Sequence, residues 1–195
     1  MDRPVSIAIE TSCRLGGVAL GAGEALLAEV DFDAGSRHAA QLVSRLAGML
    51  AGQSLRPAQL DEVYVSVGPG SFTGTRVAVT VGRMLAQTVP GLRVVAVPTT
   101  AAVAQAAREL AWQRLGVILD AREGLIYAET FIRPGGPIVA DGPKGVMTPR
   151  EYLAAAGRPL ALVGEGLTYH AMPDELVLAP HSLDATPHLP SAGNV

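Results

Sequence analysis

Hydrophobic residues at the start of the chain follow two different periods. An uninterrupted apolar and β-branched segment, Val5–Glu10, is typical of a buried strand. Shorter apolar segments follow at residues 18–20 and 25–32, and their connections are too short for a crossover. We therefore expect three antiparallel strands. Apolar positions then recur every three or four residues, which predicts an amphipathic helix over residues 37–51.

Strands and helices continue to alternate beyond this helix. Residues 63–67 predict a fourth strand, which is parallel to the first because a helix connects the two. A glycine-rich turn leads into a predicted helix over residues 73–88. A fifth strand over residues 94–97 and a helix from about residue 99 to about residue 114 follow. This order of elements predicts the α/β class.

The strand pattern begins a second time near residue 115. The segment "LGVILD" (115–120) is an apolar strand that ends in an acid, as "SIAIE" (6–10) does. A turn at Gly124 and a strand over residues 125–132 repeat the opening hairpin. A short helix over residues 149–156, and a strand at residues 160–163, complete a copy that is shorter than the first.

The repeat divides the chain into two related lobes. We expect the first lobe to cover residues 1–114 and the short second lobe to cover residues 115–172. Prolines and polar residues recur over residues 173–195, so we expect this segment to be a flexible tail.

Composition narrows the class of protein. The 195 residues are 49% hydrophobic and 17% charged, which favours a packed core over disorder. A net charge of −3 lacks the basic excess of a protein that binds nucleic acid alone. A single cysteine, Cys13, excludes an internal disulfide framework and indicates a reducing compartment. With no signal-peptide pattern and no long apolar stretch, we expect a cytoplasmic protein that does not enter a membrane.

The glycine-rich turn allows two interpretations. Glycines before a helix let a phosphate approach backbone N–H groups, and such a loop would use Gly68, Gly70, Ser71 and Thr73. However, "GPGSFTG" has neither the Gly-Lys-Ser/Thr of a Walker A loop nor the spacing of G-x-G-x-x-G. The alternative is a tight turn followed by a serine or threonine helix cap.

The helix after this turn has an unusually bare face. Gly74, Ala78 and Gly82 lie on one stripe, beside an apolar stripe that includes Val81 and Leu85. One face must pack on the sheet, and a bare second face permits close approach of another helix. The residues alone leave open whether that helix belongs to this chain or to another subunit.

Two other groups of polar residues could suggest a metal site or a phosphate site, but each has a plainer explanation. His181, Asp184 and His188 have ligand chemistry but lie in the proline-rich tail without a rigid frame, so we expect no metal site. Asp120 and Glu123 are either an acid pair beside a phosphate or ordinary strand-end and turn carboxylates.

Three segments together resemble the TsaB (YeaZ) family, bacterial proteins needed to make threonylcarbamoyladenosine (t6A) at position 37 of tRNAs. They are "IAIETSCRLGGVAL" (7–20), "SVGPGSFTGTRVAVTVGRMLA" (66–86) and "ILDAREGLIYAETF" (118–131). The resemblance implies an actin-like fold (ASKHA, ribonuclease H-like) of two lobes, each with a mixed sheet flanked by helices.

The resemblance also implies a non-catalytic role. Members of this family partner the catalytic subunit TsaD, with the ATPase TsaE joining the complex and tRNA engaged indirectly. Helices 37–51 and 73–88 of the first lobe would pack against TsaD, or against a second copy in isolation. The expected interface residues are Ala39, Leu42, Val43, Leu46, Gly74, Ala78, Val81, Gly82 and Leu85.

The sequence departs from the TsaD and TsaB patterns at positions that bear on metal and nucleotide binding. TsaD-like proteins carry a metal-binding histidine pair after the fifth strand, where this chain reads "PTTAAVAQAA". Glu10 stands where TsaB proteins usually have aspartate, and its longer side chain would crowd a phosphate. We therefore expect no cofactor, with ATP or ADP only at a subunit junction. The alternative is an actin-like ATPase or kinase with a nucleotide between the glycine turn and Asp120.

Overall fold

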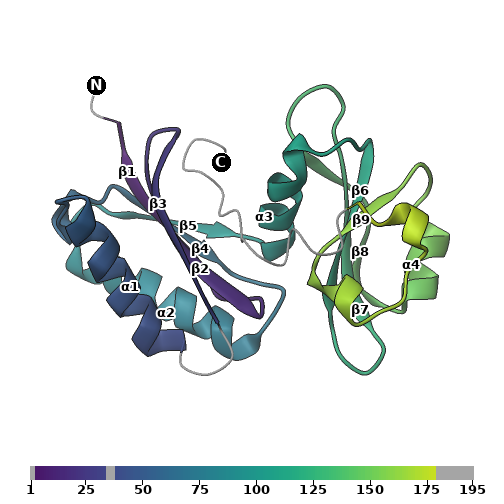
Figure 1. Cartoon of the computed structure of the whole chain (residues 1–195), viewed down its shortest axis with the longest axis horizontal. Coiled ribbons are helices and arrows are strands. Elements are labelled where there is room, and N and C mark those ends of the chain that lie inside the picture. Colours follow the sequence, from purple (N-terminus) through teal and green to yellow (C-terminus); the bar gives the residue numbers. More distant parts are fainter. Residues whose placement is uncertain (1–2, 34–37, 179–195) are drawn as a thin grey trace. The chain divides into compact units, whose positions relative to one another are not determined.

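The computed structural model describes residues 3–33 and 38–178, which form two compact units (Figure 1). Unit one extends to Ala102, and unit two begins at Val103. None of the helices in these described ranges combines the length and the hydropathy that a bilayer crossing requires.

Unit one is built on a five-stranded mixed sheet with the order β3-β2-β1-β4-β5. The three antiparallel strands are β1 (Val5–Glu10), β2 (Leu15–Ala22) and β3 (Ala25–Asp33). Strands β4 (Glu62–Ser66) and β5 (Arg93–Val97) continue the sheet in parallel with β1. The predicted hairpins and the predicted parallel fourth strand are confirmed.

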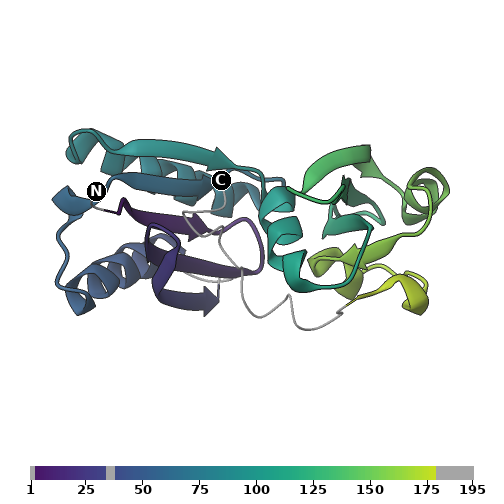
Figure 2. The same ribbon diagram turned by 90° about the horizontal axis from the view of Figure 1, so that it is seen from above.

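Two helices cover one face of this sheet. Helix α1 (His38–Gly52) contacts β2 and β3, and α2 (Phe72–Thr88) contacts β4, β1 and β5. They contact each other and lie side by side in both views (Figures 1 and 2). The core between helices and sheet is aliphatic: Ile7, Ile9, Val18, Leu20, Val63 and Val65 meet Leu42, Leu46, Met49, Leu50, Ala78 and Val81.

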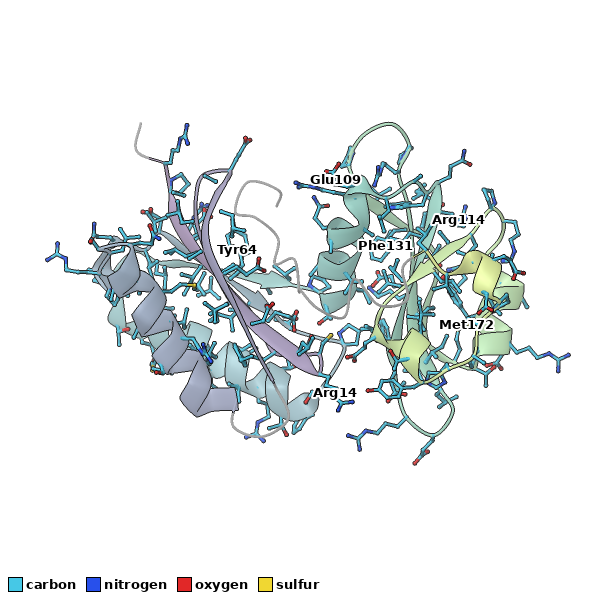
Figure 3. The ribbon with its side chains drawn as sticks, in the orientation of Figure 1. Arg14, Tyr64, Glu109, Arg114, Phe131 and Met172 are labelled. Carbon is cyan, nitrogen blue, oxygen red and sulfur yellow. The ribbon has the colours of Figure 1, made fainter. Side chains whose placement is uncertain are left out.

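The opposite face of the sheet carries smaller residues and one tyrosine. Ala8, Ala19 and Val97 pack there around Tyr64, which Figure 3 labels, and Ala102 of α3 (Thr99–Ala106) joins them. Alternating residues of β1 therefore serve the two faces, as the period of a strand requires.

Helix α3 is shorter than the sequence predicts. We expected it to continue to about residue 114, but it ends at Ala106 and a single 3₁₀ turn, Ala107–Glu109, follows. The carbonyl of Ala107 accepts the N–H of Leu110 at 3.1 Å and the indole N–H of Trp112 at 2.7 Å, and these bonds close the end of the helix. Strand pairing from residue 114 onward outweighs the local helix propensity.

Unit two repeats the strand order of unit one in its sheet, β8-β7-β6-β9. Strands β6 (Arg114–Asp120) and β7 (Ile126–Ile132) form the predicted hairpin, and β9 (Ala161–Val163) is parallel to β6. Helix α4 (Pro149–Ala155) connects β8 to β9, as α1 connects β3 to β4. Each unit thus has three antiparallel strands, a helix and a parallel strand.

Strand β8 (Val139–Met147) is an element that the sequence did not predict. It contains Gly142, Pro143 and Gly145, residues that ordinarily argue against a strand. They are tolerated because β8 is the outer strand of its sheet and pairs with β7 alone among the described strands.

The core of unit two is organised around Tyr152 of α4. A Cβ at position 116 would overlap the Tyr152 hydroxyl, so Gly116 allows the ring to lie against β6. The hydroxyl hydrogen-bonds Thr130 at 3.0 Å, which satisfies it inside the core.

Candidate functional site

Buried polar side chains gather where β1 and β4 end and α3 begins. Glu10 closes β1 and is 2% exposed, and its Oε1 accepts the backbone N–H and the hydroxyl of Ser12, each at 2.5 Å. Ser66 ends β4 and Thr99 starts α3, and both are buried beside Ser12. The turn after β1, from which Arg14 projects (Figure 3), is therefore built around a buried carboxyl group.

Three hydroxyls connect these residues in a hydrogen-bonded chain. The Thr99 hydroxyl lies 2.7 Å from that of Ser12 and 2.8 Å from that of Ser66. Each hydroxyl has one proton to donate. The Ser12 hydroxyl donates to Glu10 Oε1 and accepts from the Ser66 hydroxyl at 3.3 Å. The three hydroxyls and the Glu10 carboxyl group therefore form one buried hydrogen-bonded cluster.

Burial dominates the acid–base behaviour of Glu10. Desolvation raises its pKa above the ordinary value of 4.5, against the opposing effect of hydrogen bonds from Ser12, Ser66 and the Cys13 N–H. The Glu10 carboxyl group therefore accepts hydrogen bonds in a buried position that disfavours its charged form.

The glycine-rich turn packs directly against this hairpin. A Cβ at Gly70 would overlap the carbonyl of Ser12, and a Cβ at Gly74 would overlap that of Thr11. Hydrogen bonds close the contact: Ser71 N–H donates to Ser12 O at 2.6 Å, and the Thr11 hydroxyl donates to Gly74 O at 2.7 Å. These glycines are thus needed for close backbone contact within the chain itself.

The residues of the expected phosphate loop have local roles in the structure. The Ser71 hydroxyl accepts the N–H of Gly74 at 3.2 Å and caps α2, as the tight-turn interpretation predicts. Gly68 adopts φ +90° and its carbonyl accepts the N–H of Thr99 at 2.9 Å. Thr73 is exposed on the first turn of α2.

The small-residue stripe of α2 faces the sheet of its own unit. Ala78 is fully buried, and a Cβ at Gly82 would lie 2.7 Å from the side chain of Val65. The expectation that Gly74, Ala78 and Gly82 lie open to a partner helix is therefore wrong, because the three residues are buried, Gly74 against the turn after β1 and Gly82 against β4.

The other expected interface residues divide into two groups. Leu42, Leu46 and Val81 are also buried in the core of unit one. Val43 is 47% exposed and Leu85 is half-buried, so both remain available to a partner. The side chain of Ala39 lies outside the described part of the chain.

Helices α1 and α2 instead expose a face that the sequence analysis did not single out. On α1 it consists of Val43, Ala47, Gly48 and Ala51, and no atom lies within 4 Å of a Cβ built on Gly48. On α2 the exposed large apolar residues are Phe72 and Met84. Arg45, Arg76 and Arg83 are exposed on the same two helices, whose sequences contain no aspartate or glutamate. We call these residues the outer α1–α2 face.

The sequence did hold a signal for this face. Leu42, Leu46, Met49 and Leu50 mark the buried side of α1, so the small apolar residues at other positions must lie outside.

The turn after β6 occupies the position in unit two that the Glu10 turn occupies in unit one. Asp120 accepts the N–H of Arg122 at 3.1 Å and pairs with His170 Nε2 at 2.9 Å. Desolvation tends to raise the pKa of Asp120, but the hydrogen bonds and charges of His170 and Arg122 outweigh it, so the pKa lies below 3.8. Glu123 is exposed.

Sequence reasoning missed His170, which lies fifty positions from its partner. Within the described ranges no cluster of three or more His, Cys, Asp or Glu side chains is arranged to hold a metal ion. His181, Asp184 and His188 fall outside those ranges.

Comparison with known proteins gives consistent results. The model of the family "TsaD: tRNA N6-adenosine threonylcarbamoyltransferase" matches residues 32–143. A Bacillus subtilis (strain 168) protein, "tRNA threonylcarbamoyladenosine biosynthesis protein TsaB", is 28% identical over 177 residues, which cover 88% of this chain and 76% of that protein.

Two solved structures from Pseudomonas aeruginosa share the fold. One, described as an uncharacterised protein with similarity to peptidase YeaZ, superimposes with a TM-score of 0.73 at 28% identity, covering 85% of this chain and 78% of the other. The second, described as YeaZ, has a TM-score of 0.69 at 25% identity and covers 83% and 84%. Because the family model spans more than half of the sequence, and the relatives share an actin-like α/β fold, the chain belongs to the TsaD family and resembles its TsaB (YeaZ) members.

Proposed function

We propose that this protein is a non-catalytic partner subunit in the synthesis of t6A37 in tRNA, and that it binds a TsaD-like catalytic subunit through the outer α1–α2 face. The observation that carries the proposal is the exposed, small and apolar surface of α1. The tRNA-modification role of the Bacillus subtilis relative supports the pathway.

Gly48 lowers the stability of helix α1, and this loss is offset only if a second helix packs on α1. Glycine destabilises a helix interior by about 1 kcal/mol relative to alanine, and Gly48 has open space where a Cβ would be. Its small size has no packing role inside the chain. A partner helix that approaches closely over Val43, Ala47 and Ala51 would bury this surface and use the absence of a side chain at residue 48.

Charge indicates what kind of partner fits. Arg45, Arg76 and Arg83 add positive charge to the exposed sides of α1 and α2, and neither helix supplies an acid. The complementary surface is therefore one that combines apolar residues with aspartates or glutamates. In a two-fold dimer of this chain the same positive charge would face itself, so a homodimer should be weaker than the complex with an acidic partner.

Two features support a subunit without its own nucleotide chemistry. The turn after β1 is filled by the buried, hydrogen-bonded Glu10 side chain, and Asp120 is engaged by His170. We expect ATP or ADP to bind only at a junction with another subunit, and a TsaE-like ATPase to join through the complex.

Co-purification tests the interface directly. A Gly48→Arg substitution places a long charged side chain on the face, at a position where an added Cβ has no atom within 4 Å. We expect it to abolish co-elution with the TsaD-like subunit from the same organism in size-exclusion chromatography. The matched control is Val146→Arg, because Val146 is an exposed apolar residue in unit two.

The two variants have different expected outcomes. Neither substitution should lower the melting temperature, since Gly48→Arg replaces a helical glycine by a better helix former, and the Val146→Arg protein should still form the complex. A complex that survives Gly48→Arg at wild-type affinity would remove this face from the proposal.

Isothermal titration calorimetry of the isolated chain with ATP distinguishes the partner subunit from the alternative, an actin-like ATPase or kinase. Only the ATPase or kinase should give clear binding heats.

A further inference from the structure

Among the large apolar side chains that the structure describes, that of Phe72 at the start of α2 is the most exposed, at 75%. We infer that Phe72 and Arg76 together anchor the outer α1–α2 face to its partner. The Phe72 ring enters an apolar pocket of the partner, and the Arg76 guanidinium binds a carboxylate beside that pocket. This inference rests on the proposed function and adds to it the residues and the chemistry that select the partner.

Hydrogen bonds fix the backbone on which Phe72 is carried. The N–H of the preceding residue, Ser71, donates to the carbonyl of Ser12 at 2.6 Å, and the carbonyl of Ser71 accepts the N–H of Thr75 at 2.8 Å. The start of α2 is thus tied to the turn after β1. An exposed aromatic ring on a fixed backbone loses little conformational freedom when it binds. Aromatic side chains of this kind commonly supply much of the binding energy of an interface.

Arg76 is held on the Phe72 ring by the geometry of the helix itself. Its Cζ atom lies 5.3 Å from the centroid of the ring. Residues four positions apart are neighbours on a helix, and a long side chain points back toward the helix N-terminus. The ring face attracts the cation. Stacking leaves the N–H groups around the edge of the guanidinium available, and these match the two oxygens of a carboxylate.

The outward side of α2 continues this positive charge. At about 100° per residue, positions 72, 76 and 83 point within about 40° of one another. All three residues are exposed, whereas Ala78 and Val81 on the other side of the helix are buried. Within residues 3–33 and 38–178, no carboxylate forms a salt bridge with Arg76 or Arg83. The aromatic ring therefore lies at one end of a stripe whose charges the described residues do not neutralise.

This charge selects a different protein over a second copy of the chain. A two-fold dimer through the same face would bring arginines toward arginines, because neither α1 nor α2 contains an acid. An aspartate or glutamate of the TsaD-like subunit would instead be attracted to Arg76. The occupant is therefore a surface of that subunit on which a carboxylate lies beside an apolar pocket.

A double-variant cycle tests the anchor. Calorimetry at low salt would give the dissociation constant for the TsaD-like subunit of the same organism with the wild type, Phe72→Ala, Arg76→Gln and the variant that carries both substitutions. We expect Phe72→Ala to weaken binding about 30-fold and Arg76→Gln about tenfold. The double variant should lose about 100-fold or less, below the product of the two effects, because without the ring the guanidinium is no longer held in place.

Matched controls separate loss of the anchor from loss of structure. Val146→Ala and Arg150→Gln change exposed residues of unit two, and both should bind as the wild type does. All variants should melt within about 2 °C of the wild type, since the substituted side chains are exposed. Arg76→Gln should also make the dissociation constant less sensitive to salt, which a purely structural role would not do.

Failure of the inference differs from failure of the proposed function. If Gly48→Arg abolishes the complex but Phe72→Ala binds within about threefold of the wild type, the face is the interface and Phe72 is not its anchor. Single losses that multiply in the double variant would show that Arg76 acts independently of the ring. A homodimer that Phe72→Ala dissociates, with unchanged affinity for the TsaD-like subunit, would assign the anchor to a second copy. A wild-type chain that does not bind the TsaD-like subunit would overturn both.

Discussion

At the scale of single residues, Glu10 shows how a carboxyl group is accommodated inside the protein at the end of a strand. Its carboxyl group is buried among hydroxyl and amide donors, and desolvation raises its pKa. Aspartate at this position would be one methylene shorter and would reach these donors less well. The glutamate side chain therefore fills the turn after β1 with the chain's own carboxyl group.

The raised pKa has a measurable consequence for stability. A carboxyl whose pKa is higher in the folded than in the unfolded state contributes most at low pH, and this contribution is lost as the pH rises from 4.5 through the raised value. We predict that the free energy of unfolding of the wild type, minus that of Glu10→Gln, falls over this window. Urea unfolding at several pH values measures it, and a difference independent of pH would contradict the prediction.

Asp120 should show the opposite behaviour. Its pKa is lowered in the folded state, so its contribution is present above 3.8 and is lost as the pH falls through the lowered value. We predict that His170→Ala raises the pKa of the Asp120 carboxyl toward 3.8 in a carbon-13 NMR titration. An unchanged value would mean that the Arg122 N–H alone holds the carboxylate.

At the scale of elements, both units place glycines where a turn presses on the end of a strand. Gly70 and Gly74 meet the turn after β1, and Gly164 and Gly166 meet the backbone of Ile118 and Leu119 in β6. In each unit this turn follows the parallel strand, β4 or β9. The duplicated architecture therefore includes its close backbone contacts as well as its strand order.

Two helical glycines offer a matched test of this contact. A Cβ at Gly74 would overlap the Thr11 carbonyl, so Gly74→Ala should destabilise the chain by about 3 kcal/mol or more. Gly48 has open space, so Gly48→Ala should stabilise it by about 1 kcal/mol. Denaturant unfolding of both variants measures the contrast. Similar effects of the two substitutions would contradict the packing described for α2.

The sequence predicted most elements, since hydrophobic period and turn residues specify them locally. It failed where a distant contact decides the outcome. Pairing with β7 makes a strand of β8 despite Pro143, and pairing of β6 ends α3 early. The side chain of Val65 fills the space over Gly82, and no pattern within α2 could show which of its faces meets the sheet.

At the scale of the whole molecule, the outer α1–α2 face determines how the protein should assemble. The three arginines and an acidic partner attract each other, and salt screens this attraction. We predict that the dissociation constant with a TsaD-like subunit rises with salt, while any homodimer through the same face becomes tighter. Sedimentation at low and high ionic strength distinguishes the two, and parallel trends would contradict the charge argument.

The sequence of strand β8 hinders the addition of a strand from another molecule to the second sheet. An outer strand with free backbone groups can recruit a strand from another molecule and start a fibril. Gly142, Pro143, Lys144 and Gly145 interrupt β8 in the middle of its length, where proline offers no N–H and lysine adds charge. This border of unit two is therefore a poor template for strand addition, so crowded solutions of the protein should resist aggregation there.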